Sequence, residues 1–409
     1  MGVYVHLLGY ASYMVQQESI TPIGITNYRN SNKLFGIKDA DRFQHIYVIG
    51  KTGTGKSTLL KRMALEDIIR GNSVAIIDPH GDISKDLLEK VPEARKSDIV
   101  IFNPLDPNTT TYNPLAGVSS SYHSLVASGL ISSLRNIWSD SWGPRTEYIL
   151  RFSILSLLWF PTATLLDIQK LLTQKEFRNS VLAFVGDEHI LSFWKNEFEK
   201  YSPQLRNEVI SPILNKIGLF ASVTPLRHIF GDGKNNIKLQ QVMDGGKVFI
   251  ANLAKGRIGE DACSLLGSML VSGFQLAAIH RAKLPEHQRK PFYLYIDECH
   301  SFITLSFADI LSEARKYKLS LFLTHQYIGQ LQEPIRAAIF GNIGTLICFR
   351  IGADDAAFLR NEFAPVFDEH DLINLPRHSI YLKLMIDGMT SIPFSAVTHP
   401  LYNKNVDTV

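Results

Sequence analysis

The residues most able to do chemistry in this chain lie in a glycine-rich segment, GKTGTGKST, between a short apolar run and a helical pattern. Its spacing lets successive backbone N–H groups curl around phosphates at the positively polarised start of a helix. Because Gly53 and Gly55 lack Cβ atoms, phosphates can approach closely. Lys56 would reach the β- and γ-phosphates, and the Ser57 hydroxyl would hold Mg²⁺. We therefore predict that a nucleoside triphosphate binds to Gly50, Lys51, Thr52, Gly53, Thr54, Gly55, Lys56, Ser57 and Thr58.

Two carboxylates at the end of a second apolar run would complete such a site. Residues 292–296 are apolar and are followed directly by Asp297 and Glu298. An apolar strand that delivers two acids is typical of the metal and water half of a nucleotide hydrolase. Asp297 would bind the metal either directly or from its second coordination shell. Glu298 would polarise the water that attacks the γ-phosphate. Alone, such a pair also fits a surface turn, but beside the glycine-rich segment it predicts catalysis.

Three further polar residues could act on the γ-phosphate. Gln326 follows the apolar run 319–325 and would sense this phosphate from the edge where parallel strands end, although a solvated strand end is the alternative. Arg315 and Arg350 could each reach the phosphate of a neighbouring subunit, because a planar guanidinium stabilises the charge that develops during phosphoryl transfer. A surface ion pair is the alternative for each arginine. The turn at residues 78–82 lies at the same edge, and we assign it a structural role rather than a metal site.

The tetrad of residues 297–300 also spells a DExH box, as in superfamily 2 helicases. Those helicases place the box much nearer to the phosphate loop and carry an arginine-rich motif on a second nucleotide-facing domain. Here a long helical stretch separates Lys56 from Asp297, and no arginine-rich string follows. The helicase interpretation is therefore disfavoured.

The elements that must position these residues form a parallel α/β pattern. The phosphate loop follows one apolar run, and further runs occupy residues 73–82, 98–104, 246–253, 291–298, 319–326 and 344–351. In these runs consecutive residues are apolar, and not only every second one. Such runs suit strands that helices cover on both faces. We predict a RecA-like P-loop fold with an inserted all-helical subdomain. The expected division is an N-terminal segment (1–42), the first part of the core (43–118), the helical insertion (119–244) and the second part of the core (245–409). A final hairpin turning at residues 387–388 is expected to close the sheet edge.

Composition places the chain among ordinary globular proteins. Its 409 residues are 45% hydrophobic and 20% charged, with a net charge of +3, which says little about a nucleic-acid partner. The three cysteines are widely spaced and fit neither a disulfide framework nor a metal motif, which suggests reduced thiols. The apolar stretch at residues 3–15 is interrupted and short of the roughly 20 residues that a spanning helix needs. We expect no intrinsic membrane span, no signal peptide and a cytoplasmic location.

The ordered set of motifs resembles one family. It comprises HIYVIGKTGTGKSTLL, IIDPHGD, IDE, SEARKYKLS, LTHQ and GNIGTLICFRIG, in that order, from about Phe43 to Pro400. The set resembles the HerA–FtsK superfamily of ring-forming, DNA-pumping ATPases, and most of all the conjugative coupling proteins of type IV secretion. By motif, Lys56, Ser57, Asp297, Glu298 and Gln326 match the nucleotide residues of the family. Arg315 occupies the place of its trans-acting arginine.

This resemblance implies a homo-hexameric ring that binds ATP and Mg²⁺ at subunit interfaces and moves DNA through its channel without sequence preference. It also implies a membrane secretion channel or a relaxase as partner, at the inner face of the membrane. A HerA-like motor working with a nuclease, or a non-translocating NTPase that recruits secretion substrates, are the alternatives. Loops that grip DNA phosphates need basic groups. The candidates are Lys255, Arg257, Arg281, Lys283, Arg289 and Lys290.

Overall fold

The computed structural model describes residues 19–231 and 237–398, and the structural statements below concern these residues. One sheet of 11 strands organises the chain, in the order β2-β1-β13-β10-β9-β3-β8-β7-β4-β6-β5. The strands from β9 to β5 pair in parallel, and those from β9 to β2 pair antiparallel. The parallel strands are β9 (Thr345–Cys348), β3 (Ile46–Ile49), β8 (Leu319–His325), β7 (Phe292–Ile296), β4 (Ser73–Asp78), β6 (Val248–Asn252) and β5 (Ile99–Phe102).

Helices cover both faces of the parallel strands, because side chains that alternate along each strand enter two separate cores. In β3, Tyr47 and Ile49 pack into one hydrophobic cluster, whereas Ile46 and Val48 pack into the other. The second cluster includes α3 (Lys56–Ile69) and α4 (Asp82–Lys90). The first includes, on the opposite face, α12 (Leu239–Asp244), α13 (Lys255–Ile258), α14 (Glu260–His280), α15 (Leu305–Leu311), α16 (Glu333–Asn342), α17 (Ala353–Phe363) and α18 (Glu369–Ile373).

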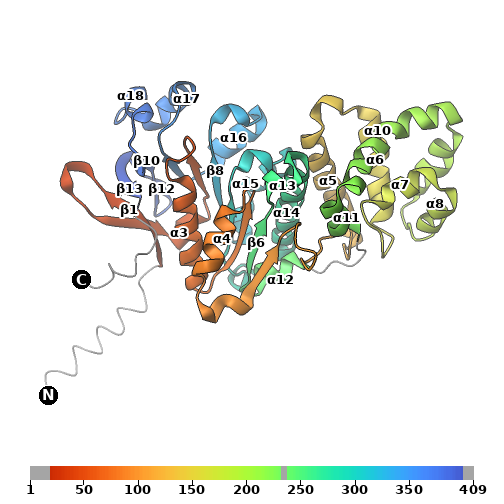
Figure 1. Cartoon of the computed structure of the whole chain (residues 1–409), viewed down its shortest axis with the longest axis horizontal. Coiled ribbons are helices and arrows are strands. Elements are labelled where there is room, and N and C mark those ends of the chain that lie inside the picture. The colour runs from red at the N-terminus through yellow and green to blue at the C-terminus, as the bar shows by residue number, and fades with distance from the viewer. Residues whose placement is uncertain (1–18, 232–236, 399–409) are drawn as a thin grey trace, which may run out of the picture.

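Among the described residues between β5 and β6, every element is helical, and this part lies to one side of the sheet (Figure 1). Its α-helices are α5 (His123–Ile137), α6 (Pro144–Leu157), α7 (Asp167–Thr173), α8 (Lys175–Leu182), α9 (Glu188–Ser192), α10 (Pro203–Ser222) and α11 (Thr224–Gly231), followed by α12. Its apolar side chains join the core cluster of α14, which attaches the insertion to the sheet domain. The predicted fold class, a parallel P-loop core with a helical insertion, is confirmed. The domain boundaries themselves stay a prediction.

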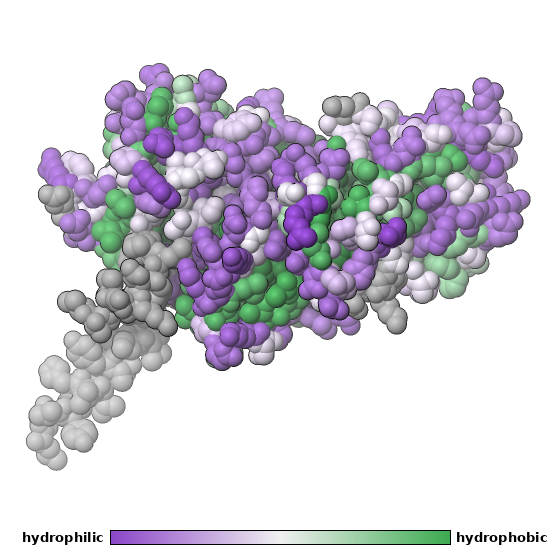
Figure 2. Space-filling view, in the orientation of Figure 1, coloured by the Kyte–Doolittle hydropathy of each residue, from purple (hydrophilic) through white to green (hydrophobic). Residues whose placement is uncertain are grey.

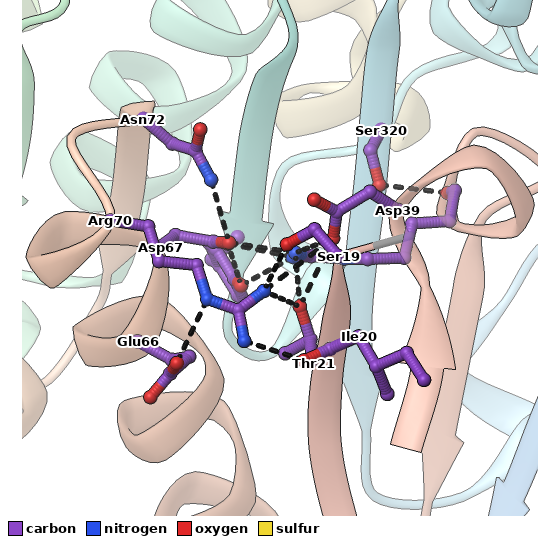
Figure 3. Close-up of polar contacts among 11 residues, drawn as sticks. Ser19, Ile20, Thr21, Asp39, Glu66, Asp67, Arg70, Asn72 and Ser320 are labelled. Carbon is purple, nitrogen blue, oxygen red and sulfur yellow. Dashed lines mark hydrogen bonds and ion pairs between the residues drawn. The ribbon is translucent and has the colours of Figure 1, made fainter. Parts of the chain in front are cut away.

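A buried polar cluster fastens the N-terminal hairpin to the helix that follows the phosphate loop. The hairpin strands β1 (Ile20–Thr26) and β2 (Leu34–Lys38) extend the sheet beyond β13, and α2 (Asp39–Arg42) follows them. Arg42 donates through both terminal nitrogens to Asp67 of α3, at 2.7 Å each, and also to the hydroxyls of Tyr295 and Thr21. Arg70, just beyond α3, faces Thr21 and the neighbouring backbone of β1 (Figure 3). Of the described residues in the predicted N-terminal segment, 20–26 and 34–38 therefore form strands of the main sheet.

The C-terminal hairpin has the predicted turn but not the predicted place. Asp387 and Gly388 have φ values of 52° and 78° and join β11 (Met385–Ile386) to β12 (Met389–Thr390). The flanking strands β10 (Ser379–Lys383) and β13 (Phe394–Thr398) lie inside the sheet, because β1 pairs with the outer side of β13. The expectation that this hairpin closes the sheet edge was wrong, since β2 forms that edge.

One described helical stretch, residues 260–283 beginning with α14, has the length and apolar composition of a membrane span, and 72% of its apolar window is buried within the fold. The stretch at residues 3–15, considered above as too short to span, lies outside the described residues. Hydrophilic residues dominate the face in Figure 2, and a hydrophobic patch lies over the edge strand β5. In that strand Ile101 is 43% exposed.

Candidate nucleotide-binding site

The phosphate loop connects β3 to α3 and has the backbone that its glycines permit. Gly53 and Gly55 have φ values of 77° and 128°, which L side chains rarely adopt. Gly55 is the N-cap of α3, so the unpaired N–H groups of the first helical turn face the loop. A Cβ at Gly50 would lie 2.6 Å from the Cβ of Phe349, so the strand end also requires glycine. The segment is shaped to bring backbone amides close to an anion.

Lys56 is folded into this loop. Its side chain is 5% exposed, and its ammonium donates to the carbonyls of Gly50 at 2.6 Å and Lys51 at 3.2 Å. Burial lowers the pKa of Lys56, while the carboxylates of Glu298 and Asp297 oppose that shift. The charge of Lys56 therefore lies between the phosphate loop and the acidic strand end.

The two acids reach this place because β7 lies two strands from β3, with β8 between them. Asp297 is 4% exposed and accepts a hydrogen bond from the Thr324 hydroxyl of β8. Burial raises the pKa of Asp297 to about 6, and the charges of Glu298 and Asp78 add to the rise. Glu298 is 8% exposed and has a left-handed backbone with φ 48°. Sequence-distant segments thus converge at the carboxyl edge of the sheet, where ligands of open α/β sheets bind.

The oxygen donors at this edge fit Mg²⁺. Ser57 stands in the first turn of α3, and Asp297 brings a carboxylate whose repulsion by other acids a divalent cation would offset. Within the described chain, no group of three or more His, Cys, Asp and Glu side chains could hold a metal. Mg²⁺ in nucleotide sites is commonly held by substrate phosphates, water and one or two protein oxygens.

Gln326 lies beside the acids at the carboxyl edge of the sheet, and its sensing of the γ-phosphate stays a prediction. It follows β8 directly, and its side-chain amide donates to Glu298 Oε1 at 2.8 Å. The preceding His325 is fully buried, and its Nδ1 lies 2.7 Å from the Tyr47 hydroxyl of β3. Burial lowers the pKa of His325 to about 3, with His300 and Lys56 adding to the effect. The strand that separates the loop from the acids therefore holds both halves of the site together.

The two predicted arginines occupy different edges of the sheet. Arg350 follows β9, and its carbonyl accepts from the Lys51 amide at 2.8 Å, so it adjoins the phosphate loop of its own chain. Arg315 is exposed in the short 3₁₀ helix Ala314–Tyr317, just before β8 begins. That is the amino edge of the sheet, opposite the loop, so the chain does not bring Arg315 to its own nucleotide site. The roles of both arginines stay predictions.

Other sequence candidates divide into structural and surface residues. Asp78 accepts from the amides of His80, Gly81 and Ser84, and these bonds shape the turn into α4. Arg281 is fully buried and bonds Asp244 and three carbonyls, so its proposed contact with DNA was wrong. The guanidinium of Arg289 is likewise engaged by backbone carbonyls. Lys255 and Arg257 lie in the α13 turn after β6, at the carboxyl edge, with Arg257 exposed.

Sequence reasoning missed residues that contact the site from the antiparallel side. The amide of His378, just before β10, donates to the Thr54 carbonyl at 2.9 Å. A Cβ at Gly55 would lie 2.8 Å from His378 Nδ1, so the imidazole packs directly against the loop. His378 itself has φ 66°. No motif marks this residue; the signal available in the sequence was the glycine that leaves room for it.

Comparison with known proteins identifies a family for this chain. Residues 36–363 match the family model of the type IV secretion-system coupling protein DNA-binding domain. The chain is 22% identical over 394 residues to the type 4 coupling protein DotL of Legionella pneumophila subsp. pneumophila, with 80% of this chain and 50% of DotL covered. The chain thus spans about half the length of this curated relative.

Two solved structures illustrate the shared fold. The plasmid coupling protein TrwB in complex with ADP and Mg²⁺ has a TM-score of 0.66 at 19% identity, covering 96% of this chain and 92% of TrwB. VirB4 of Thermoanaerobacter pseudethanolicus has a TM-score of 0.66 at 14% identity, covering 94% and 97%. Since the family model spans most of the sequence, the chain belongs to the type IV secretion-system coupling protein DNA-binding domain family, as its motifs predicted.

Proposed function

We propose that this chain is an ATP-hydrolysing motor that moves DNA without sequence preference, as a coupling protein of a type IV secretion system. The observation that carries the proposal is the convergence of the phosphate loop and the acidic end of β7 around the buried Lys56 ammonium. Membership of a family of DNA-binding coupling domains supports DNA as the partner. The TrwB complex with ADP and Mg²⁺ supports ATP and magnesium as the ligands.

In this proposal the loop 50–58 binds the phosphates, and Lys56 neutralises the charge on the β- and γ-phosphates. Ser57 and Asp297 would hold Mg²⁺, which when bound would withdraw charge from the transferred phosphoryl group. Glu298 accepts a proton from the attacking water, and Gln326 senses the γ-phosphate through its bond to Glu298. Arg350 in its own chain, or Arg315 from a neighbouring subunit, stabilises the transition state.

The proposed assembly is a homo-hexameric ring at the cytoplasmic face of the inner membrane, working with a secretion channel or relaxase. Each subunit would consist of an N-terminal segment (1–42), a core in two parts (43–118 and 245–409) and the helical insertion (119–244). Lys255 and Arg257 follow β6 at the carboxyl edge, where they would grip DNA phosphates. Such contacts make binding independent of sequence and weaker at high salt.

The test compares ATP hydrolysis with and without DNA for three proteins. The unmodified chain should hydrolyse ATP faster with DNA, and Lys56→Ala should lose nucleotide binding. Glu298→Gln should bind ATP and hydrolyse it at least about 100-fold more slowly, because a general base contributes roughly 10²–10⁴-fold. Sizing by light scattering with ATP and DNA reports ring formation. Equal hydrolysis with and without DNA would instead indicate a substrate-recruiting NTPase, and unchanged turnover in Glu298→Gln would remove the base assignment.

A further inference from the structure

The short segment that follows β8 approaches both carboxylate oxygens of Glu298. Gln326 starts this segment and donates to Glu298 Oε1 at 2.8 Å. Gln330 ends the 3₁₀ helix Ile328–Gln330, and its amide nitrogen lies 3.2 Å from His300 Nε2. The other ring nitrogen of His300, Nδ1, lies 3.6 Å from Glu298 Oε2. The segment thus reaches one oxygen directly and the other through His300.

The polar contacts that connect Gln330, His300 and Glu298 run in one direction. The Gln330 amide nitrogen can only donate, so His300 Nε2 accepts and the ring proton of a neutral imidazole resides on Nδ1. Neither Glu298 Oε2 nor His300 Nδ1 has a hydrogen-bond partner among the described residues, although both atoms are buried. A buried acceptor and a buried donor that face each other at 3.6 Å need only a small movement to form a charge-assisted bond.

The surroundings hold the His300 ring and leave the segment accessible. His325 packs against His300 with 5.4 Å between ring centroids and is itself fixed by Tyr47. The segment is anchored where the Ile328 amide donates to Asp355 at 2.9 Å, and between its two glutamines Tyr327 is 52% exposed.

We propose that His300 is a positioning residue for Glu298, with its Nδ1–H directing Oε2, and that Gln330 fixes the His300 tautomer from the segment 326–330. This inference rests on the proposed role of Glu298 as the base. His300 does not touch the nucleotide in this arrangement; it acts through the carboxylate. The histidine of the DExH-like tetrad would therefore position Glu298, a role that does not depend on a relationship to helicases.

The test uses the full chain and the matched variants His300→Asn and His300→Gln. An asparagine amide can stand where Nδ1 stands, whereas a glutamine amide reaches toward the place of Nε2. We expect His300→Ala and His300→Gln to lower kcat about tenfold, with KM for ATP within about twofold, and His300→Asn to recover most of kcat. Gln330→Ala should lower kcat as much as His300→Ala does. The double variant Gln330→Ala/His300→Ala should be no slower than either single variant, because both substitutions interrupt the same series of contacts to Glu298.

A control separates this inference from the proposed function. In a Glu298→Gln background, His300→Ala should cause no further loss of single-turnover rate, because the residue it positions is already changed. A further loss there, or equal kcat in the asparagine and glutamine variants, would overturn the positioning role. If Glu298→Gln itself turns over normally, the base assignment fails instead. Thermal melting and binding of a non-hydrolysable ATP analogue confirm that each variant is folded.

Discussion

The buried pair of Arg42 and Asp67 predicts a sharp and asymmetric response to mutation. Arg42 is 1% exposed and Asp67 is 0% exposed, and the two share parallel hydrogen bonds of 2.7 Å. Burial alone would lower the pKa of Arg42, but Asp67 and Tyr295 outweigh it and raise the pKa above its ordinary value. Asp67→Leu leaves the guanidinium buried with Asp39, at 3.7 Å, as its remaining carboxylate neighbour, and the loss of the close partner costs about 4 kcal/mol, in the range for a broken buried pair.

Removing both charges should cost less than removing one. With Arg42→Met and Asp67→Leu together, neither charge of the pair remains. The Thr21 hydroxyl loses one partner and the Tyr295 hydroxyl loses both Arg42 and Asp67, at about 1 kcal/mol for each hydroxyl, while the half-buried Asn72 amide that also bonded Asp67 can turn to water. We expect a total of about 2 kcal/mol, so the double variant should be more stable than Asp67→Leu alone. The Arg42 guanidinium carbon lies 3.8 Å from the centre of the Tyr293 ring, and a methionine side chain in its place would keep part of this contact.

The assay is native-state hydrogen exchange, because a chain of this size does not unfold in one step. Protection of the β1 amides (Ile20–Thr26) should fall about a thousandfold in Asp67→Leu, the equivalent of about 4 kcal/mol, and recover in the double variant. Amides of α10 (Pro203–Ser222), in the helical insertion, serve as the internal control and should not change. Additive losses in the double variant, or unchanged β1 protection in Asp67→Leu, would refute this reasoning.

Three other outcomes are expected. The pKa of His45 is lowered from 6.5 to about 4 by burial, so the unfolded segment binds more protons below pH 6.5 and its stability falls by about 3 kcal/mol between pH 6.5 and 4; His45→Asn should remove that slope in the hydrogen-exchange protection of the β3 amides (Ile46–Ile49). Gly55→Ala should abolish ATP-analogue binding in calorimetry, because its Cβ would meet an imidazole nitrogen at 2.8 Å and displace the loop. The Cβ of Gly53→Ala meets no atom of the chain within 4 Å, so this variant should stay folded at a cost of about 1–2 kcal/mol for its positive φ, and it should weaken binding only through the phosphates that the Cβ obstructs. Mixed Arg315→Ala and Lys56→Ala subunits should regain hydrolysis at interfaces that pair an intact arginine with an intact loop; no recovery would leave Arg315 structural.

Much of the core could be predicted because its signals are local. The glycine spacing at residues 50–55 fixes the loop backbone, and doubly apolar runs such as 292–296 identify strands buried on both faces. The antiparallel extension could not be predicted, because β1 pairs with β13 through backbone bonds that no side-chain pattern encodes. Arg281 was misassigned for a related reason. A basic residue in a polar loop has the same letters whether it faces solvent or, as here, several carbonyls.

The pairing of β3 sets the order in which the protein can be completed on the ribosome. Ile46 pairs with Phe322 on one side and Thr345 on the other, and the whole helical insertion is translated before either partner exists. Such non-local pairing delays folding until distant segments emerge. The nascent chain therefore carries its glycine loop through synthesis of the whole insertion without the two strands that flank β3. The proposed nucleotide site can be completed only after β9 has been made.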